Sequence, residues 1–467
     1  MPLTSANNQK SSLDVLILAA GLGTRMKSNL AKVLHKLDGR PLIAHVCSTA
    51  AGLKPNAIVV VVGHQAGNVQ TAVEAELGAN GARFALQAEQ RGTGDAVLAA
   101  EDALANSNST VLILSGDVPM VRGETLRNLI DKHNQNRSAC TILTIKLENP
   151  TGYGRIVRDE ANNFLRITEH RDCSDEERKI REVNSGIYCF DSRKLFDALR
   201  QVRPANDQGE YYLTDVPAIL KSAGESVSLY LHPDSREVSG VNTRAELAEF
   251  ENLLRRSTVR RLMLEAGVTF IDPSHTYISS QATIGRDCVI RPDVHIEGST
   301  VIGEACEIHQ GSRIVNSTLG ARVTVKDHSL IVDSEIGDDC AVGPFAHLRM
   351  NARMAERAVV GNFVEVKKST IGRGTKAMHL TYLGDATIGE KTNIGAGTIT
   401  CNYDGKQKHP TIIEDNVKIG SDTMLVAPVR VGQGSVTGAG SVVTEDVPPN
   451  SLVAGVPARV KKKLVKE

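Results

Sequence analysis

Hydrophobic and polar positions follow two different patterns along this chain, and the change of pattern divides it. In the first half, short apolar runs alternate with stretches of mixed composition such as Thr93–Leu104: Val15–Leu18, Ala57–Val62, Arg83–Gln87, Val111–Leu114 and Thr141–Ile145. Apolar runs of this length, without alternating polar residues, are typical of strands that are buried on both faces of a sheet. The mixed stretches have helical character. The alternation therefore predicts an α/β doubly wound (Rossmann-like) domain over residues 1–243.

In the second half, an aliphatic residue returns every six positions. The clearest series is Ile284, Ile290, Ile296, Ile302, Ile308 and Ile314, and the period slips by one residue at Leu319 and again at Ile336. A period of six fits neither a helix nor an ordinary strand. It fits a coil of three short strands, each with one inward aliphatic side chain. We therefore expect a left-handed parallel β-helix of hexapeptide repeats, with roughly nine turns, over residues 268–467.

A charged segment joins these two regions. Residues 244–267 have helical spacing with many Glu and Arg residues, and Gly267 is a suitable helix stop. We expect a solvated helical linker without chemistry of its own.

Composition narrows the class of protein. Among the 467 residues, 54 Lys and Arg balance 54 Asp and Glu, which argues against a nucleic-acid or membrane-surface binder. No apolar run reaches the length of a membrane span, and the polar first twelve residues lack a signal-peptide core. Eight cysteines without a Cys-x-x-Cys pair favour reduced thiols. We expect a cytoplasmic protein with no nucleic-acid partner and no membrane insertion.

A glycine-rich loop follows the first apolar run. Gly21 and Gly23 allow the backbone to approach a ligand, and Arg25 and Lys32 add two positive charges. A strand that leads into such a loop suits a polyphosphate. The alternative, a surface turn with solvated charges, explains less because Thr24, Arg25 and Lys32 all accompany the glycines.

Two further motifs stand where apolar runs end, which is where α/β sheets bind ligands. Gln87 offers an amide donor and acceptor that suit a uracil edge, and Gly92 and Thr93 offer backbone contacts. Thr93 as a simple helix cap is an equally good interpretation. Asp117 is a natural Mg²⁺ ligand, although an isolated aspartate could also be a turn residue.

Other polar residues suit sugar substrates. Gly154 would let a sugar lie against the backbone, and Glu169 and Asn184 could hold its hydroxyl and N-acetyl groups. In the second half, Arg349 and Lys367 could bind a sugar phosphate where the repeat is interrupted. His379 is a candidate general base near neutral pH, although a single histidine is more often structural.

The motifs of the first half occur in a diagnostic order: Leu-Ala-Ala-Gly-Leu-Gly-Thr-Arg-Met, Gln-Ala-Glu-Gln-x-Gly-Thr, Gly-Asp-Val-Pro, Thr-Gly-Tyr-Gly-Arg, Asn-x-Gly-Ile and Gly-Val-Asn. They resemble the pyrophosphorylase half of the bifunctional GlmU family, which joins a UDP-N-acetylglucosamine pyrophosphorylase to a glucosamine-1-phosphate N-acetyltransferase. The chain departs from the family pattern at Ala31, where proline is usual, and at Ser115, where tyrosine is frequent.

This resemblance implies roles for particular residues. Asp117 and Asn242 would hold Mg²⁺, and Arg25 and Lys32 would neutralise phosphate charge. The residues expected to line the nucleotide-sugar site are Leu18, Ala19, Ala20, Gly21, Lys32, Gln87, Gly92, Thr93, Ser115, Gly116, Asp117, Gly154, Glu169, Asn184 and Asn242.

The second half resembles the acetyltransferase part of the same family. By that likeness His379 would deprotonate the attacking amine, and Arg349, Lys367, Tyr382 and Asn393 would bind the amino-sugar phosphate. Acetyl-CoA, the co-substrate, would contact Ala396, Asn402, Tyr403, Ser421 and Ala439. The family can use an arginine near the C-terminus for a CoA phosphate, and the matching stretch here is Val453–Pro457, with Arg459 and Lys461 to Lys463 beyond it. In hexapeptide acyltransferases the CoA site lies between subunits, which implies a homotrimer.

The leading interpretation is a bifunctional enzyme that makes UDP-N-acetylglucosamine, a precursor of peptidoglycan and lipopolysaccharide, from glucosamine-1-phosphate, acetyl-CoA and UTP. A second is a monofunctional nucleotidyltransferase whose β-helix serves only as a trimer scaffold. A third, a non-catalytic assembly subunit, is disfavoured by the intact Arg25, Asp117 and Asn242.

Overall fold

The computed structural model describes residues 12–104, 109–206 and 208–464. The chain forms two compact units, Met1–Phe250 and Glu251–Glu467, and the division falls inside helix α9 (Arg244–Glu265), where the sequence predicts the linker. Each unit is described by itself below.

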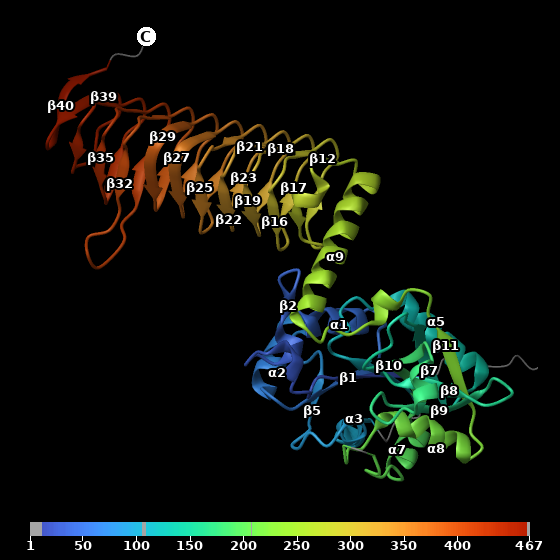
Figure 1. Cartoon of the computed structure of the whole chain (residues 1–467). Helices are drawn as coiled ribbons and strands as arrows, with labels where there is room; N and C mark the ends of the chain where they lie inside the picture. The colour runs from blue at the N-terminus through green and yellow to red at the C-terminus, as the bar shows by residue number, and fades with distance from the viewer. Residues whose placement is uncertain (1–11, 105–108, 207, 465–467) are drawn as a thin grey trace, which may run out of the picture. The chain divides into compact units, whose positions relative to one another are not determined.

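The first unit is built on a mixed sheet with strand order β11-β7-β10-β6-β1-β4-β5 (Figure 1). Strand β1 lies between two parallel neighbours, β4 and β6, whereas β10 runs antiparallel to β6 and β7. A short hairpin of β8 and β9 extends from β10. The strands are β1 (Ser12–Leu18), β4 (Ala57–Val62), β5 (Arg83–Leu86), β6 (Ser109–Ser115), β7 (Cys140–Lys146), β8 (Arg155–Arg158), β9 (Phe164–Thr168), β10 (Glu182–Asp191) and β11 (Val227–Leu231).

Both faces of this sheet are covered. Val15 and Ile17 of β1 pack in one hydrophobic cluster and Leu16 between them packs in another, so successive side chains serve opposite faces. The predicted helix Thr93–Leu104 is present but broken into α3 and α4. The helices are α1 (Leu42–Ala51), α2 (Ala66–Leu77), α3 (Thr93–Leu98), α4 (Glu101–Leu104), α5 (Gly123–Asn136), α6 (Asp175–Arg178), α7 (Ser192–Leu199) and α8 (Val216–Ser222). This confirms the doubly wound, Rossmann-like fold class.

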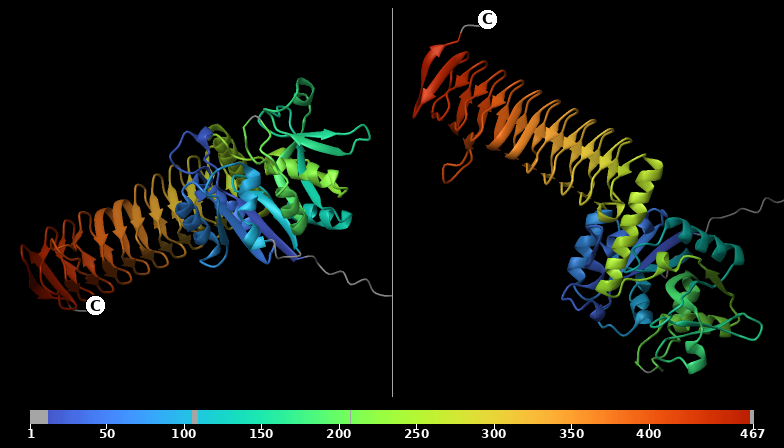
Figure 2. Two further views of the ribbon diagram at one scale, coloured as in Figure 1. Left: turned by 90° about the horizontal axis from the view of Figure 1, so that it is seen from below. Right: turned by 45° about the horizontal axis from the view of Figure 1, so that its top comes forward.

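The second unit is the predicted β-helix, in which short parallel strands stack on three faces (Figures 1 and 2). The first face holds β12 (Thr269–Phe270), β15 (Val289–Ile290), β18 (Glu307–Ile308), β21 (Thr324–Val325), β24 (Ala341–Val342), β31 (Asn393–Ile394), β34 (Lys418–Ile419) and β37 (Val436–Thr437). The second holds β13 (Tyr277–Ile278), β16 (His295–Glu297), β19 (Arg313–Val315), β22 (Leu330–Val332), β25 (His347–Arg349), β32 (Ile399–Cys401), β35 (Met424–Val426) and β38 (Val442–Val443). The third holds β14 (Thr283–Ile284), β17 (Val301–Ile302), β20 (Thr318–Leu319), β23 (Glu335–Ile336), β26 (Arg353–Met354), β28 (Thr370–Ile371), β30 (Ala386–Ile388), β33 (Thr411–Ile413) and β36 (Val429–Val431).

Two longer strands turn the corner between the first two faces. These are β27 (Val359–Lys367) and β29 (Lys376–Gly384), which pair in parallel along most of their length. The coil ends in an antiparallel hairpin of β39 (Ser451–Gly455) and β40 (Ala458–Lys463).

The six-residue repeat is the inward-facing column of each face. Ile302, Leu319 and Ile336 stack on one another in register and are buried. The slip in the repeat is therefore a coil shortened by one residue at a corner, where the inward columns stay aligned.

The structure also agrees with the expectations for the cysteines and for Gly267. All eight cysteines are free thiols, and seven of them are buried. Gly267 follows α9 with a φ of 68°, a left-handed conformation that ends the helix. Among the described residues, no helix combines the length and apolar character needed to cross a bilayer.

Candidate active sites

A cavity of about 310 Å³ opens at the carboxyl ends of the central strands of the first unit. Leu18 and Ser115 stand side by side where β1 and β6 end, and Gln87 directly follows β5. The cavity is lined by Leu18, Ala19, Ala20, Gly21, Lys32, Val33, Gln87, Gln90, Gly92, Thr93, Ala96, Ser115, Asp117 and Glu210. Most residues predicted for the nucleotide thus surround one hollow. Val33, Gln90, Ala96 and Glu210 also line the cavity but were not predicted as site residues, although Gln90 lies within the Gln-Ala-Glu-Gln-x-Gly-Thr motif.

The glycine loop packs against Lys32, the loop cation that lines this cavity. Gly23 has a φ of 63°, and a Cβ added there would lie 2.5 Å from the Cβ of Lys32. The loop therefore passes Lys32 so closely that glycine is required. Gly116, predicted for the nucleotide site, does not line the cavity; it directly follows β6, and its N–H donates to the carbonyl of Leu18 at 2.9 Å.

Two oxygens converge on one ammonium group at the edge of the cavity. Lys32 Nζ forms an ion pair with Asp117 Oδ2 and lies 3.1 Å from Asn242 Oδ1. Arg25 also donates to Asn242 Oδ1, at 2.8 Å, and the N–H of Val241 donates to the carbonyl of Asp117 at 2.9 Å. A carboxylate and an amide oxygen that share one cation are a donor set that fits Mg²⁺.

The residues predicted to contact the uracil edge are held by hydrogen bonds to nearby segments. The Gln87 side chain is buried and donates to the Gly92 carbonyl at 3.1 Å and to Asp95 at 2.9 Å. Thr93 does not cap its helix, since its hydroxyl accepts from the N–H of Leu213 at 3.0 Å instead. The simple helix-cap interpretation of Thr93 is therefore wrong.

A second group of predicted residues gathers beside the β8–β9 hairpin. The N–H of Asn184 donates to the carbonyl of Gly154 at 2.9 Å, and a Cβ added at Gly154 would lie 3.4 Å from a carboxylate oxygen of Glu169. Glu169 accepts from the Thr214 hydroxyl at 3.0 Å. Burial raises the pKa of the Glu169 carboxyl above its ordinary value, partly opposed by that hydrogen bond. Gly154, Glu169 and Asn184 thus lie together in one polar cluster.

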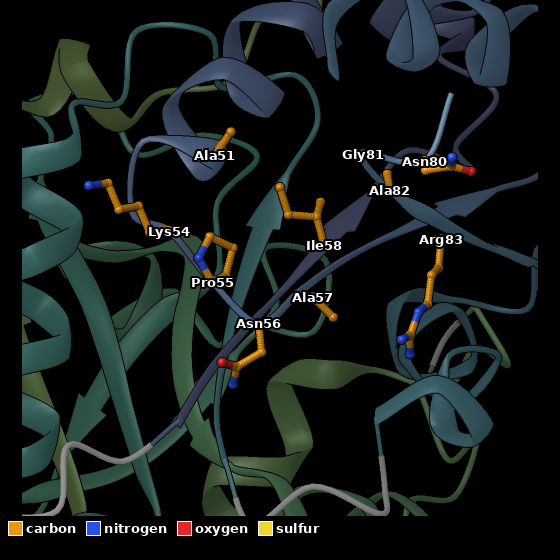
Figure 3. A pocket seen from close by; sticks show the side chains of 10 residues that line it. All are labelled: Ala51, Lys54, Pro55, Asn56, Ala57, Ile58, Asn80, Gly81, Ala82 and Arg83. Carbon is orange, nitrogen blue, oxygen red and sulfur yellow. The ribbon is translucent and has the colours of Figure 1, made fainter. Parts of the chain in front are cut away.

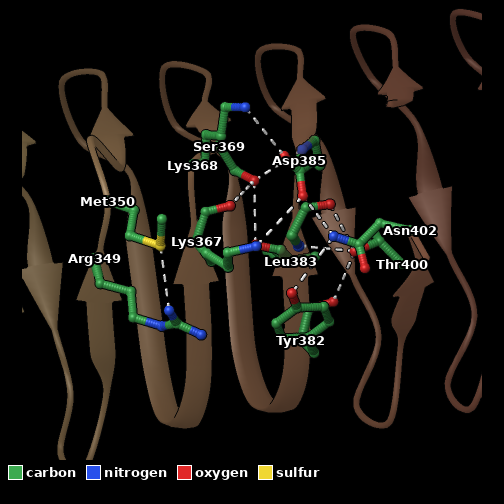
Figure 4. Close-up of polar contacts among 12 residues, drawn as sticks. Arg349, Met350, Lys367, Lys368, Ser369, Tyr382, Leu383, Asp385, Thr400 and Asn402 are labelled. Atoms are coloured by element: carbon green, nitrogen blue, oxygen red, sulfur yellow. Dashed lines mark hydrogen bonds and ion pairs between the residues drawn. The ribbon is translucent and has the colours of Figure 1, made fainter. Parts of the chain in front are cut away.

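On the β-helix, polar side chains form a network on the second face (Figure 4). Lys367 is only 5% exposed and lies 3.6 Å from Asp385, which also accepts from Asn402 at 2.6 Å. Tyr382 Oη lies 3.5 Å from Asn402 Nδ2, and Arg349 pairs with Glu365 at 2.7 Å. Tyr382 and Lys367, both predicted for the sugar phosphate, thus lie close to Asn402, which was predicted for acetyl-CoA.

Asp385, Glu365 and Lys408 belong to this region but were not predicted as site residues. The nearby ammonium group of Lys367 lowers the pKa of Lys408. Lys408 lies in the loop between β32 and β33, far from Lys367 in sequence. No local motif could therefore have revealed the pair, whereas the Gly-Asp after Tyr382 and Leu383 could have suggested Asp385.

His379 is exposed on β29, and its Nδ1 lies 2.6 Å from Asn362 Oδ1 on the neighbouring coil. Asn362 was not predicted as a site residue from the sequence. Of the other predicted sugar residues, Asn393 lies one coil further along, paired with Lys376.

The residues predicted for acetyl-CoA fall into two groups. Ala396, Ser421 and Ala439 occupy successive coils at one corner, where Asp422 N–H donates to the Ala396 carbonyl and Gly440 N–H to the Ser421 carbonyl. Asn402 is buried at the start of a loop, and the adjacent Tyr403 is 61% exposed. The corner is the convex edge of a prism, so it offers a surface rather than an enclosed pocket.

A further hollow lies at the opposite, amino-terminal ends of β4 and β5, also with a volume of about 310 Å³. It contains no predicted site residue. Its two cations, Lys54 and Arg83, point away from each other (Figure 3), so they do not form an anion site.

The fold and these two clusters define a transferase in which a nucleotidyltransferase domain is joined to a hexapeptide-repeat acyltransferase region. Family models agree: a MobA-like NTP transferase domain matches residues 15–215, a GMPPB C-terminal domain matches 273–356, and a bacterial transferase hexapeptide matches 410–445.

Similar proteins extend over nearly the whole chain. A protein of Syntrophomonas wolfei is 48% identical over 94% of this chain and 96% of its own length, and one of Pelobacter propionicus is 50% identical over 94% of each. A Heliobacterium modesticaldum protein is 49% identical over 94% of each. All three are named bifunctional protein GlmU. The chain belongs to the GlmU family of bifunctional proteins.

Proposed function

We propose that the chain catalyses two steps in the synthesis of UDP-N-acetylglucosamine, a precursor of peptidoglycan and lipopolysaccharide. The β-helix transfers acetyl from acetyl-CoA to glucosamine-1-phosphate, and the α/β domain transfers uridylyl from UTP to N-acetylglucosamine-1-phosphate. The observation that carries the proposal is that each unit has its own cluster of suitable residues.

In the α/β domain, the sugar 1-phosphate oxygen attacks the α-phosphorus of UTP and pyrophosphate leaves. Arg25 and Lys32 offset the negative charge that accumulates around phosphorus, and the main chain after β1 holds the nucleotide. Gln87, Gly92 and Thr93 face the base. Gly154, Glu169 and Asn184 hold the sugar, which places its phosphate for in-line attack.

Asp117 and Asn242 would hold Mg²⁺ in this site. The ion would neutralise phosphate oxygens and orient the triphosphate. Among the described residues no three His, Cys, Asp or Glu side chains gather as a metal site, so phosphates and water would supply the other ligands, as is usual for Mg²⁺. Chelation by EDTA is expected to stop uridylyl transfer and leave acetyl transfer intact.

On the β-helix, His379 takes a proton from the amine of glucosamine-1-phosphate as the nitrogen attacks the thioester carbonyl. The new C–N bond forms, the C–S bond breaks, and CoA leaves with the proton returned by His379. Arg349, Lys367, Tyr382 and Asn393 bind the sugar phosphate, with Lys408 as an added cation. Ala396, Asn402, Tyr403, Ser421 and Ala439 contact acetyl-CoA, and the Ser421 hydroxyl donates to the thioester oxygen.

A homotrimer in the cytoplasm completes the proposal. The acetyl-CoA residues lie on a convex corner and on an exposed loop, so a second copy is needed to form a cleft around the cofactor. Balanced charge supports small-molecule substrates and no nucleic-acid partner.

Two assays on the purified chain test both halves. One measures free thiol from acetyl-CoA and glucosamine-1-phosphate, and the other measures pyrophosphate from UTP and N-acetylglucosamine-1-phosphate. Both products are expected. Pyrophosphate without thiol would instead favour a monofunctional nucleotidyltransferase with the β-helix as a trimer scaffold.

A further inference from the structure

We infer that Asn362 is a positioning residue for His379: its side-chain carbonyl fixes the imidazole in the form that leaves Nε2 free to accept a proton. This inference rests on the proposed acetyl transfer. It assigns a role to a residue that neither the sequence motifs nor the predicted ligand contacts included.

The fold explains why these two side chains meet. Asn362 on β27 and His379 on β29 are register partners in adjacent coils. Each is followed by a residue in the left-handed conformation, Phe363 with a φ of 55° and Leu380 with a φ of 42°. The two corners therefore turn identically, and the preceding side chains leave them stacked. The Thr381 hydroxyl, 2.7 Å from the His379 carbonyl, further anchors the turn.

The contact selects one form of the ring. Asn362 Oδ1 lies 2.6 Å from His379 Nδ1, and a carbonyl oxygen can only accept a hydrogen bond. Nδ1 must therefore carry the proton, which leaves the lone pair on Nε2. After Nε2 gains a proton, Nδ1–H still donates to Asn362, so the ring keeps its orientation through the reaction.

Among the residues that the structure describes, His379 forms no ion pair within 4.0 Å. Asn362 is the hydrogen-bond partner of the ring there, and the equivalent position of the next coil is Ala396. Besides His379, the ionisable residues on β27 and β29 are Glu365, Lys367, Lys376 and Tyr382. Glu365 pairs with Arg349, and Lys367 with Asp385. A neutral carbonyl thus orients the base without adding the strong charge-assisted bond of a carboxylate.

Two substitutions test the inference. Asn362→Ala is expected to lower kcat of acetyl transfer by about 10- to 100-fold, the usual cost of losing the partner that orients a functional histidine, with little change in either KM. Asn362→Asp is expected to keep activity at high pH but to move the acid limb of the pH–rate profile to higher pH, because a carboxylate stabilises the imidazolium. Uridylyl transfer should stay unchanged in both variants.

Asn316→Ala is the matched control. Asn316 Oδ1 also reaches the neighbouring coil, accepting from the N–H of Ser299 at 3.3 Å, but has no histidine beside it. Its acetyl transfer should equal that of the original chain. Equal losses in Asn316→Ala and Asn362→Ala would show a merely structural role and overturn the inference, as would an unshifted acid limb in Asn362→Asp.

A chemical measurement separates this inference from the proposed reaction. Diethylpyrocarbonate modifies unprotonated imidazole, and peptide mass spectrometry reads its rate at His379 without any substrate. The pH midpoint of that rate should rise in Asn362→Asp. If His379 is modified with the expected shift in pH midpoint but no thiol is ever released, only the proposed acetyl transfer is contradicted. If the pH midpoint is unchanged in Asn362→Asp, the pairing of Asn362 and His379 is contradicted.

Discussion

The two candidate sites are built in opposite ways. In the α/β domain, loops that follow several strands converge on a cavity of about 310 Å³, and the half-buried carboxyl of Glu169 lies beside the β8–β9 hairpin. On the β-helix, inward positions are filled by aliphatic side chains and the functional groups stand on the outside of a prism.

The two candidate sites therefore differ in which parts of the molecule can enclose a ligand. In the sheet, parallel strands deliver their carboxyl ends to one edge, so loops of the same chain surround the cavity. The prism has no such edge, so the proposed acetyl transfer would need side chains from adjacent coils and from a neighbouring copy. Changes in the first site should therefore act within one chain, and changes in the second should also depend on assembly.

The largest expected effect comes from removing the proposed base. His379→Ala should reduce acetyl transfer by about 10²- to 10⁴-fold, the usual contribution of a general base, and leave uridylyl transfer unchanged. Parallel thiol-release and pyrophosphate assays on one preparation check this. Loss of both activities from a folded trimer would show that the two sites are not independent.

The reciprocal change is expected to be nearly as large. Asp117→Ala removes the carboxylate that pairs with Lys32 and that is proposed to hold Mg²⁺. Uridylyl transfer should therefore fall by roughly 10²- to 10³-fold, because the groups that neutralise the phosphate charge are no longer held in place. Acetyl transfer in the same variant is the control. Normal Mg²⁺-dependent uridylyl transfer would remove Asp117 from the proposed metal site.

The two folds themselves could be predicted from the sequence because each is a repeating pattern of burial. Apolar runs marked the strands of the sheet, and β4 was predicted with its exact bounds, Ala57–Val62. The period of six marked the inward columns of the prism, and its slips marked shortened coils. The break between α3 and α4 was missed, since it depends on tertiary packing rather than on composition.

Site residues were predictable where they sit in a local motif. The residues around the glycine loop share one short stretch, and most of them line the cavity. Asn362 and Lys408 were missed because their partners, His379 and Lys367, lie a coil or more away in sequence. Contacts of that kind follow from coil register, which a motif does not encode.

Dilution of the protein is expected to have a smaller effect, which should differ between the two activities. If a second copy completes the acetyl-CoA cleft, the specific activity of acetyl transfer will fall as the protein is diluted below the concentration at which the trimer dissociates. Uridylyl transfer will stay constant over the same range, because its site belongs to one chain. Sedimentation at the same concentrations gives the oligomeric state. Acetyl transfer by a demonstrated monomer would refute the shared cleft.

The smallest expected effect concerns stability and compares a carboxyl in each region. Burial raises the pKa of Glu169 in the folded chain, so the folded state holds a proton that the unfolded state releases. The stability contributed by this group is present at pH values below about 4.3, the ordinary pKa of glutamate, and is lost as pH rises through the raised value. Glutamine does not ionise, so the Glu169→Gln variant does not lose this stability as the pH rises. The melting temperature of the variant minus that of the original chain should therefore increase from pH 4 to pH 7.

Glu365→Gln is the matched substitution on the prism. Glu365 is 35% exposed and paired with Arg349, so its replacement should give no such gain with pH. Thermal melts of both variants across this pH range make the comparison. The Glu169→Gln variant should also bind N-acetylglucosamine-1-phosphate more weakly, because the carboxyl that costs stability is the group proposed to contact this substrate. A flat difference in melting temperature for Glu169→Gln would show that this carboxyl is not desolvated, and that the cleft of the α/β domain is as open to water as the outer faces of the β-helix.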